Sequence, residues 1–307
     1  MKKTGPLITS MLVPMKGDYT INWDEYKQLL NNQLACGISD VLVFDPLNWD
    51  SQAFSESERL EIIDFTIKNF RGCSRDHVIV GSAINSTMMP CDEAEMIKKT
   101  GADAIMVGML PLTSIEMMSH FHTMADVMPV IIGNSIDEIG TLRKIVEHPN
   151  IIGIRTAPTS PEYIKKVIAD IAEPIREQGR VFHVFGNDDN LIISSREAGA
   201  DGTVSLTANL VPDLIFGITK VDIKFAQIAA KELSKLIETA TYQSDASVAI
   251  RSMMESVGMI GSSASKMSGK FPLPKEIKNA IGPNAESMIV FRNSLMYSHL
   301  IKQRESR

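Results

Sequence analysis

The clearest chemical signal in the chain is Arg155, because it directly follows a short apolar run that begins after Asn150. A guanidinium group is a planar fork of N–H donors that stays protonated at ordinary pH, and it is suited to a carboxylate or a phosphate. We expect Arg155 either to hold a small anion or to pair internally with Asp45, Asp188 or Asp189. The predicted ligand-binding residues, which follow this and similar runs, are Leu47, Asn48, Asn134, Arg155, Thr156, Asp188 and Ser205.

The acidic residues in the same places raise a metal hypothesis. Hard divalent cations prefer oxygen ligands, and Asp45, Asp50, Asp188 and Asp189 are the candidates for supplying them. No histidine stands beside these acids in the sequence. We therefore predict no metal site, and we expect no cofactor.

The apolar runs themselves indicate buried strands. Each is short and apolar on both sides, which is typical of a parallel sheet with both faces covered. The segments between them have helical periodicity, as in 24–30 and 136–146. Eight strand-then-helix units predict a (β/α)8 barrel, or TIM barrel. The expected strands are 7–13, 41–44, 78–80, 105–107, 130–132, 151–152, 181–185 and 203–206.

The part of the chain after about residue 220 lacks a strand-like run of comparable quality. It predicts helices, with 269–274 as a linker. We expect residues 1–220 to form the barrel and residues 221–307 to form a C-terminal helical extension packed on it, as a single structural unit. Since active sites of such barrels lie at the C-terminal ends of the strands, function is to be sought in the residues just past each run.

Composition agrees with a large single domain and excludes some partners. The formal net charge of −6 over 307 residues leaves no basic footprint for nucleic acid. The three cysteines, Cys36, Cys73 and Cys91, have neither metal-ligand spacing nor an even number, which fits a reducing compartment. No stretch approaches the roughly 18 apolar residues of a membrane span, and segment 7–13 runs directly into Pro14 without a cleavage site. We expect a cytoplasmic protein with no membrane partner.

Several segments form a pattern by their order and spacing. The N-terminal segment reads Ile-Thr-Ser-Met-Leu-Val-Pro-Met, and a later one reads Gly-Ala-Asp-Gly-Thr-Val-Ser. The full set is 8–15, 54–59, 78–81, 101–107, 129–134, 186–189 and 199–205, with Asn209 and Pro212. Together these segments resemble the dihydrodipicolinate synthase / N-acetylneuraminate lyase family. The resemblance implies a (β/α)8 barrel that acts on a 2-oxo acid such as pyruvate.

The resemblance gives Arg155 its meaning, because the family has a lysine at the end of strand six that forms a Schiff base with the 2-oxo acid. A lysine amine can be a neutral nucleophile once its pKa is depressed. A guanidinium stays protonated and is not nucleophilic, so Arg155 cannot perform this step. The nearest other candidate is Lys16, which belongs to a polar turn that we expect to be exposed.

Other positions also lack the residues that the family uses for Schiff-base chemistry and carboxylate binding. Where the family usually has a tyrosine before an asparagine at the end of strand five, this chain has Gly133 before Asn134, and glycine supplies no acid or base. The tyrosine pair after strand four is replaced by segment 110–113. The carboxylate-binding loop, Gly-Thr-Thr-Gly-Glu in the family, is replaced by segment 46–50, in which Trp49 either lines the pocket mouth or packs against its surroundings.

Two classes of function remain open from the sequence, and whether the protein is an enzyme is undecided. The first is a protein that binds a small 2-oxo acid or related carboxylate without Schiff-base chemistry, alone or as a subunit beside an active paralogue. The second is an active 2-oxo-acid lyase, an aldolase or dehydratase, with diverged catalytic residues. Turnover of a 2-oxo acid would separate them. The resemblance also implies a homodimer or homotetramer.

Overall fold

The computed structural model describes most of the barrel and parts of the extension. The described residues are 4–72, 76–83, 89–108, 111–158, 160–220, 226–227, 231, 233–234, 238, 246–267, 276–277, 279–290 and 293. Cys73, the expected linker 269–274 and the first position of segment 110–113 lie outside them.

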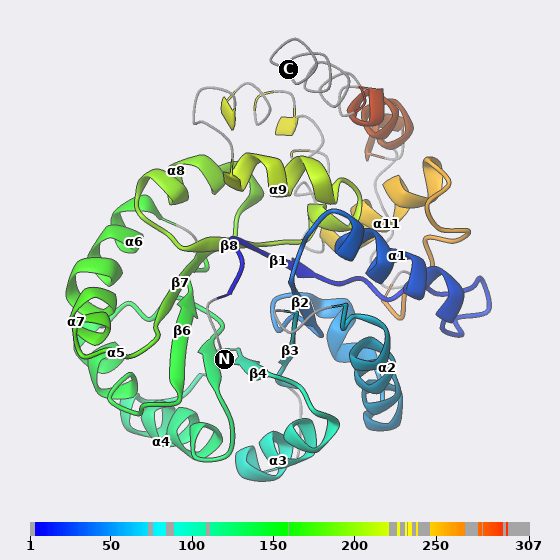
Figure 1. Ribbon diagram of the computed structural model, residues 1–307. Helices are drawn as coiled ribbons and strands as arrows, with labels where there is room; N and C mark the ends of the chain where they lie inside the picture. The colour runs from blue at the N-terminus through cyan, green and yellow to red at the C-terminus, as the bar shows by residue number, and fades with distance from the viewer. Residues whose placement is uncertain are drawn as a thin grey trace.

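Eight parallel strands close into a barrel in chain order, and Figure 1 shows this barrel with the helices around it. Closure is made by β1 and β8, where Thr9 lies opposite Ser205. The sequence-predicted barrel and all its strands are confirmed, with small shifts in their ends. The strands are β1 (Leu7–Ser10), β2 (Asp40–Val43), β3 (His77–Gly81), β4 (Ala104–Val107), β5 (Val130–Ile132), β6 (Ile151–Arg155), β7 (His183–Gly186) and β8 (Gly202–Ser205).

The helices between the strands form the outer layer of the barrel in Figure 1. The expected helical segments 24–30 and 136–146 correspond to α1 and α5. Short η segments, mostly of 3-10 type, begin several loops. The helices are α1 (Trp23–Ala35), α2 (Glu56–Asn69), α3 (Pro90–Thr100), α4 (Ser114–Ala125), α5 (Ile139–Ile145), α6 (Pro161–Val167), α7 (Glu173–Glu177), α8 (Ile192–Glu197) and α9 (Pro212–Lys220), and the η segments are η1 (Trp49–Ala53), η2 (Ile168–Ala172), η3 (Asp189–Leu191) and η4 (Thr207–Asn209).

Alternation along the strands divides the core into two layers. Side chains that point to the barrel axis fill its interior, and those that point outward pack under the helices. This is why the strands are apolar on both faces. The interior cluster consists of Ile8, Leu42, Ile79, Ala104, Met106, Ile131, Ile152, Phe185 and Val204.

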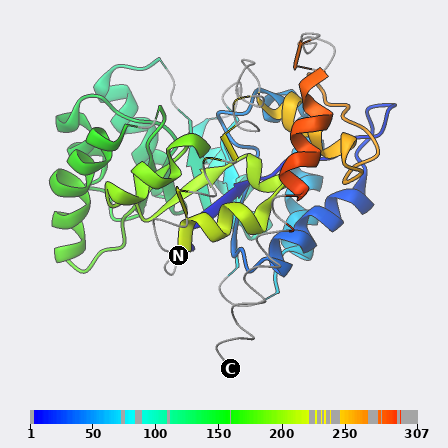
Figure 2. The ribbon, with the colours of Figure 1, turned by 90° about the horizontal axis from the view of Figure 1, so that it is seen from above.

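Much of the described C-terminal extension is helical, while residues 257–267 form turns and irregular structure. The helical parts include α11 (Ala246–Ser256) and residues 279–290. In Figure 2 the orange and red segments lie on the same side of the barrel as the blue helix α1. The boundary near residue 220 stays a prediction. Among the described helices none is long and apolar enough to cross a membrane.

A buried polar cluster joins the N-terminal ends of β2 and β3. His77 Nδ1 lies 2.8 Å from Asp40 Oδ1, and Asp40 Oδ2 accepts hydrogen bonds from the amide of Gly5 and the hydroxyl of Ser39. Both His77 and Asp40 are buried. The hydrogen bond to Asp40 raises the pKa of His77 above its ordinary value of 6.5.

This cluster should make stability depend on pH. Because the folded pKa of His77 is raised, its contribution is fully present below about pH 6.5 and is lost as pH rises through the folded value. We expect the free energy of unfolding to fall by about 1 kcal/mol more in wild type than in His77→Gln between roughly pH 6 and pH 8.5. Urea denaturation at several pH values measures it. Asp40→Asn should flatten the same slope, and parallel profiles for all three proteins would refute the assignment.

Candidate functional site

Arg155 ends β6 and reaches across the C-terminal end of the barrel. Its side chain is fully buried, its Nη1 donates to Asp45 Oδ1 at 2.7 Å, and its Nε donates to the carbonyl of Gly133 at 2.7 Å. Asp45 follows β2, and β2 and β6 are diametrically opposite in a closed barrel with this strand order. The guanidinium therefore lies across the barrel axis, at the end where this fold places active sites.

One nitrogen of this guanidinium has an unmet hydrogen-bonding capacity. Arg155 Nη2 is buried and has no hydrogen-bond partner among the described residues. A buried donor without a partner costs about 1–3 kcal/mol. An anionic group at the barrel mouth would satisfy this donor, whereas Asp45 alone does not.

Asp45 is turned toward the axis by an unusual backbone conformation at Phe44. Leu42 belongs to the interior cluster, so simple alternation would point the side chain of Phe44 inward as well. Phe44 instead has φ of 60°, a left-handed conformation that is strained for a bulky residue. Its ring packs in the outer core layer, and the following carboxylate faces Arg155.

Arg59, in α2, supports this turn from outside. Its guanidinium carbon lies 4.3 Å from the ring centroid of Phe44, and its Nη2 donates to the carbonyl of Gly81 at 2.7 Å. Burial lowers the pKa of Arg59 to about 10, so the group stays cationic at neutral pH. The strained end of β2 is therefore fixed by packing and by a cation–π contact.

A second buried ion pair joins the loop after β2 to the C-terminal extension. Arg251, in α11, donates from Nη2 to Asp50 Oδ2 at 2.6 Å and from Nη1 to the carbonyl of Val13 at 2.7 Å. Both charged side chains are at most 2% exposed. The loop between Asp45 and Asp50 is thus tied at one end to β6 and at the other to α11.

The acidic pair after β7 is placed differently from the expectation of a contact with Arg155. Asp188 accepts a hydrogen bond from the amide of Asn190 and so begins η3. Asp189 Oδ2 accepts from the amide of Thr207. Burial raises the pKa of Asp189 to about 6. Of the three carboxylates expected as partners of Arg155, Asp45 is the one that pairs with it.

Three other predicted ligand-binding residues, Leu47, Asn48 and Thr156, have hydrogen-bond partners within the protein. The amide of Leu47 donates to Asp45 Oδ1 at 2.9 Å, and Asn48 accepts from the amide of Asp50 to begin η1. Thr156 donates its hydroxyl to the carbonyl of Phe185. Leu47 and Thr156 are therefore hydrogen-bonded to residues at strand ends, whereas the bond of Asn48 lies within the loop itself.

Asn134 and Ser205 are the remaining members of the predicted set. Asn134 is half-buried beside Gly133, at the end of β5. Ser205 faces the helix layer, because Val204 belongs to the interior cluster and alternation turns the next residue outward. Its hydroxyl oxygen accepts from the amide of Ala208. Ser205 thus lies behind the strand, and its contact with a ligand stays a prediction.

Sequence reasoning missed Ser10 and Arg251. Ser10 is two residues after Ile8, a member of the interior cluster, so alternation points it toward the axis at the end of β1. Its buried hydroxyl has no hydrogen-bond partner within the described part of the chain. The signal for Ser10 was available, since it is a polar residue within an apolar run. Arg251 had no comparable local signal.

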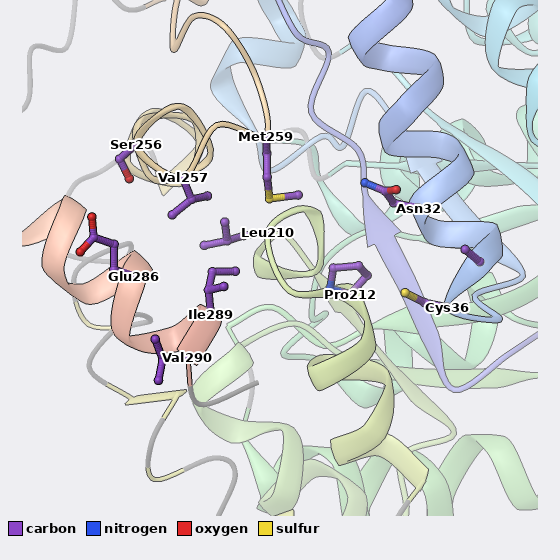
Figure 3. A pocket seen from close by; sticks show the side chains of 11 residues that line it. Asn32, Cys36, Leu210, Pro212, Ser256, Val257, Met259, Glu286, Ile289 and Val290 are labelled. Atoms are coloured by element: carbon purple, nitrogen blue, oxygen red, sulfur yellow. The ribbon is translucent and has the colours of Figure 1, made fainter. Parts of the chain in front are cut away.

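A hollow lies beside the barrel, between α1, α9, α11 and the helical residues 279–290, as Figure 3 shows. Its volume is about 820 Å³, and most of its lining is apolar, including Leu210, Val257 and Ile289. Its one carboxylate, Glu286, would repel a small acid. Since binding of a small polar ligand needs converging polar groups, the barrel mouth is the better candidate. No cluster of metal-ligating side chains was found among the described residues.

The fold defines a (β/α)8 barrel protein, and the polar groups at the strand ends form a candidate site at the barrel mouth. The chain belongs to the dihydrodipicolinate synthetase family, whose sequence profile matches residues 3–280.

Relatives and solved structures agree with this assignment. A 4-hydroxy-tetrahydrodipicolinate synthase from Gluconobacter oxydans (strain 621H) is 29% identical over 222 residues, covering 67% of this chain and 70% of the relative. One from Xanthomonas campestris pv. campestris is 27% identical over 217 residues, covering 67% and 68%. The structure of 4-hydroxy-tetrahydrodipicolinate synthase from Methylacidiphilum fumariolicum SolV has a TM-score of 0.84 at 18% identity, covering 96% of this chain and 99% of that one. At such identity the structure supports the fold alone.

Proposed function

We propose that this family member binds a small carboxylate at the barrel mouth, with Arg155 as the anchoring cation, and that it does not use a Schiff-base lysine. The main support is the buried guanidinium of Arg155, which reaches across the C-terminal ends of the strands to Asp45. Its Nη2 has no hydrogen-bond partner among the described residues. Charge-assisted hydrogen bonds to a carboxylate are about twice as strong as neutral ones. A 2-oxo acid is the ligand class that the family favours, and one solved neighbour, from Acinetobacter baumannii, is described as complexed with pyruvate.

The groups at the strand ends do not favour imine chemistry. A guanidinium cannot provide the neutral amine that attacks a carbonyl. Lys16, the nearest alternative in the sequence, is exposed in a turn closed by its own amide and the carbonyl of Thr20. Neither residue is a desolvated amine at the barrel mouth.

Gly133 has no side chain that could relay a proton, and its surroundings leave no room for one. A Cβ atom at this position would lie 2.7 Å from the carbonyl oxygen of Val107, in the neighbouring strand. Any side chain there would therefore require the backbone to shift. This supports the interpretation that the position occupied by tyrosine in the family cannot supply an acid or base in this chain.

The second candidate is an active lyase with diverged residues, and Asp189 is the observation that favours it. A buried carboxyl whose pKa is raised to about 6 exchanges protons near neutral pH. Its Oδ2 accepts from the amide of Thr207, and the hydroxyls of Ser205 and Thr207 lie beside the carboxyl group. This candidate requires 2-oxo-acid turnover whose pH profile bends near 6 and which Asp189→Asn abolishes. Turnover without that pH dependence would count against Asp189.

Calorimetric titration with pyruvate, paired with borohydride trapping and mass spectrometry, tests the proposal. We expect measurable binding and no covalent adduct, while a lysine-bearing family enzyme is labelled in parallel. Asp45→Asn with Arg155→Met, which removes both charges, should weaken binding at least about tenfold. A stoichiometric adduct on one lysine, or binding that is insensitive to the double substitution, would overturn the proposal.

Arg155→Lys is expected not to restore robust aldolase activity. The substitution supplies an amine, but Gly133 still leaves the position of the family tyrosine without a side chain. A continuous assay for released pyruvate, with the relevant aldol substrates of the family, measures this. Robust turnover by the single variant would refute the prediction.

The assembly state completes the proposed function. We expect a homodimer or homotetramer in the cytoplasm, with a small acid as ligand and with no nucleic-acid or membrane partner. The net charge of −6 supports the exclusion of nucleic acid. One solved neighbour is described as a monomeric dihydrodipicolinate synthase variant, so light scattering on the purified protein is the direct measurement.

A further inference from the structure

The loop from Asp45 to Asp50 is held between two buried ion pairs that come from opposite parts of the molecule. Asp45 pairs with Arg155 across the barrel, and Asp50 pairs with Arg251 of α11. Within the loop, the amide of Leu47 donates to Asp45 Oδ1. The C-terminal extension therefore contacts the candidate site through a segment of six residues.

The hydrogen bond from Leu47 has a specific consequence for the guanidinium of Arg155. Asp45 Oδ1 accepts from the amide of Leu47 and from Arg155 Nη1 at the same time, which fixes the orientation of this carboxylate. Nη2 of the guanidinium is then left for a ligand. If the loop relaxed, the carboxylate could rotate and chelate both terminal nitrogens, because bidentate pairing is the favoured geometry of arginine with a carboxylate.

The ion pair between Arg251 and Asp50 is well placed to hold the loop in the conformation in which Asp45 bonds only Nη1 of Arg155. Arg251 reaches Asp50 at 2.6 Å and the carbonyl of Val13 at 2.7 Å, so one side chain fixes the segments that follow both β1 and β2. Replacing a whole buried ion pair by apolar residues is often close to neutral for stability, and in this scheme the role of the Arg251–Asp50 pair is to fix the geometry of the loop. Asn48 adds a local restraint by accepting from the amide of Asp50.

We infer that Arg251 is a positioning residue for the barrel-mouth site: the C-terminal extension, through the Arg251–Asp50 pair, keeps Asp45 from chelating Arg155 and so sets the affinity for a carboxylate. The inference rests on the proposed function, in which Arg155 anchors that carboxylate. Neither Arg251 nor Asp50 contacts the ligand in this scheme.

A matched control exists in the same extension. Lys266 Nζ pairs with Glu58 Oε1 at 2.7 Å, and Glu58 lies in α2. This pair also ties the extension to the barrel, but it does not touch the loop between Asp45 and Asp50. Glu58→Gln with Lys266→Met therefore removes one tie between the extension and the barrel that does not involve this loop, whereas Asp50→Asn with Arg251→Met removes the restraint on the loop.

Two readouts on these double variants test the inference. For titration with pyruvate we expect about a tenfold loss of affinity on removing the Asp50–Arg251 pair, equal to about 1.4 kcal/mol, and at most about a twofold change in the control. By hydrogen exchange, the amide of Leu47 should become faster in the first variant alone. The single variant Arg251→Lys keeps Asp50 and the positive charge but not the planar fork of donors. It should therefore retain part of the affinity that Asp50→Asn with Arg251→Met loses.

The outcomes separate this inference from the proposed function. If both double variants weaken binding equally, the extension acts by docking alone and the positioning role is wrong. If wild type does not bind pyruvate, the proposed function fails, and exchange at Leu47 still decides whether Arg251 restrains the loop. If wild type binds pyruvate, unchanged affinity in Asp50→Asn with Arg251→Met overturns the inference, whether or not exchange at Leu47 changes.

Discussion

Arg155→Met should lower the free energy of unfolding by about 3–5 kcal/mol, a large effect for a single substitution. Asp45 is 6% exposed, and its carboxylate would lose the guanidinium that lies 2.7 Å away. The variant therefore leaves an uncompensated charge at the end of the barrel, which costs far more than the lost methylene contacts. Chemical denaturation monitored by circular dichroism measures the change.

The double variant Asp45→Asn with Arg155→Met separates the unpaired charge from the lost arginine. Asparagine keeps an oxygen that can accept from the amide of Leu47, as Asp45 Oδ1 does. Methionine fills part of the volume with apolar atoms. We expect most of the lost stability to return, since replacing a whole buried ion pair is often close to neutral. A double variant as unstable as Arg155→Met would show that the arginine itself, and not the stranded carboxylate, dominates.

The barrel could be predicted from the sequence because its signal is local and repeated. Each strand is a short run that is apolar on both faces, and this pattern follows from burial inside and outside the barrel. The interior cluster, from Ile8 to Val204, and the outer core layer both confirm it. A pattern apolar on both faces does not reveal which residues point inward, and this is why Ser205 was expected at the site and Ser10 was not.

The site could be predicted in part. The position of Arg155 at a strand end followed from the sequence, which left open whether it holds an anion or pairs with an internal carboxylate. Of the three carboxylates considered, Asp45 is the one that pairs with it in the structure. The pairing of Asp50 with Arg251 spans 201 positions, and no local pattern specifies such a contact. The left-handed backbone conformation of Phe44 could not be predicted from the sequence either, because bulky aromatic residues are uncommon in that conformation.

The conformation of Phe44 depends on Gly81 in the neighbouring strand. The positive φ of Phe44 carries its carbonyl oxygen toward the neighbouring strand β3, where a Cβ atom at position 81 would lie 1.8 Å from that oxygen. Glycine is therefore required by the close approach of two backbones. The turn that presents Asp45 to Arg155 depends on this missing side chain, as well as on the contact between Phe44 and Arg59.

Gly81→Ala should accordingly destabilise the protein by more than about 4 kcal/mol, or prevent folding, because the obstructing atom belongs to the backbone and cannot rotate away. Gly217→Ala is the matched control. Gly217 lies within α9, where an added methyl group would meet no atom within 4 Å, and the substitution should be neutral or stabilise by about 0.5–1 kcal/mol. Thermal and urea denaturation of both variants measure the difference. If Gly81→Ala were as stable as wild type, Phe44 could not be held in the left-handed conformation, and the orientation of Asp45 toward Arg155 would need another explanation.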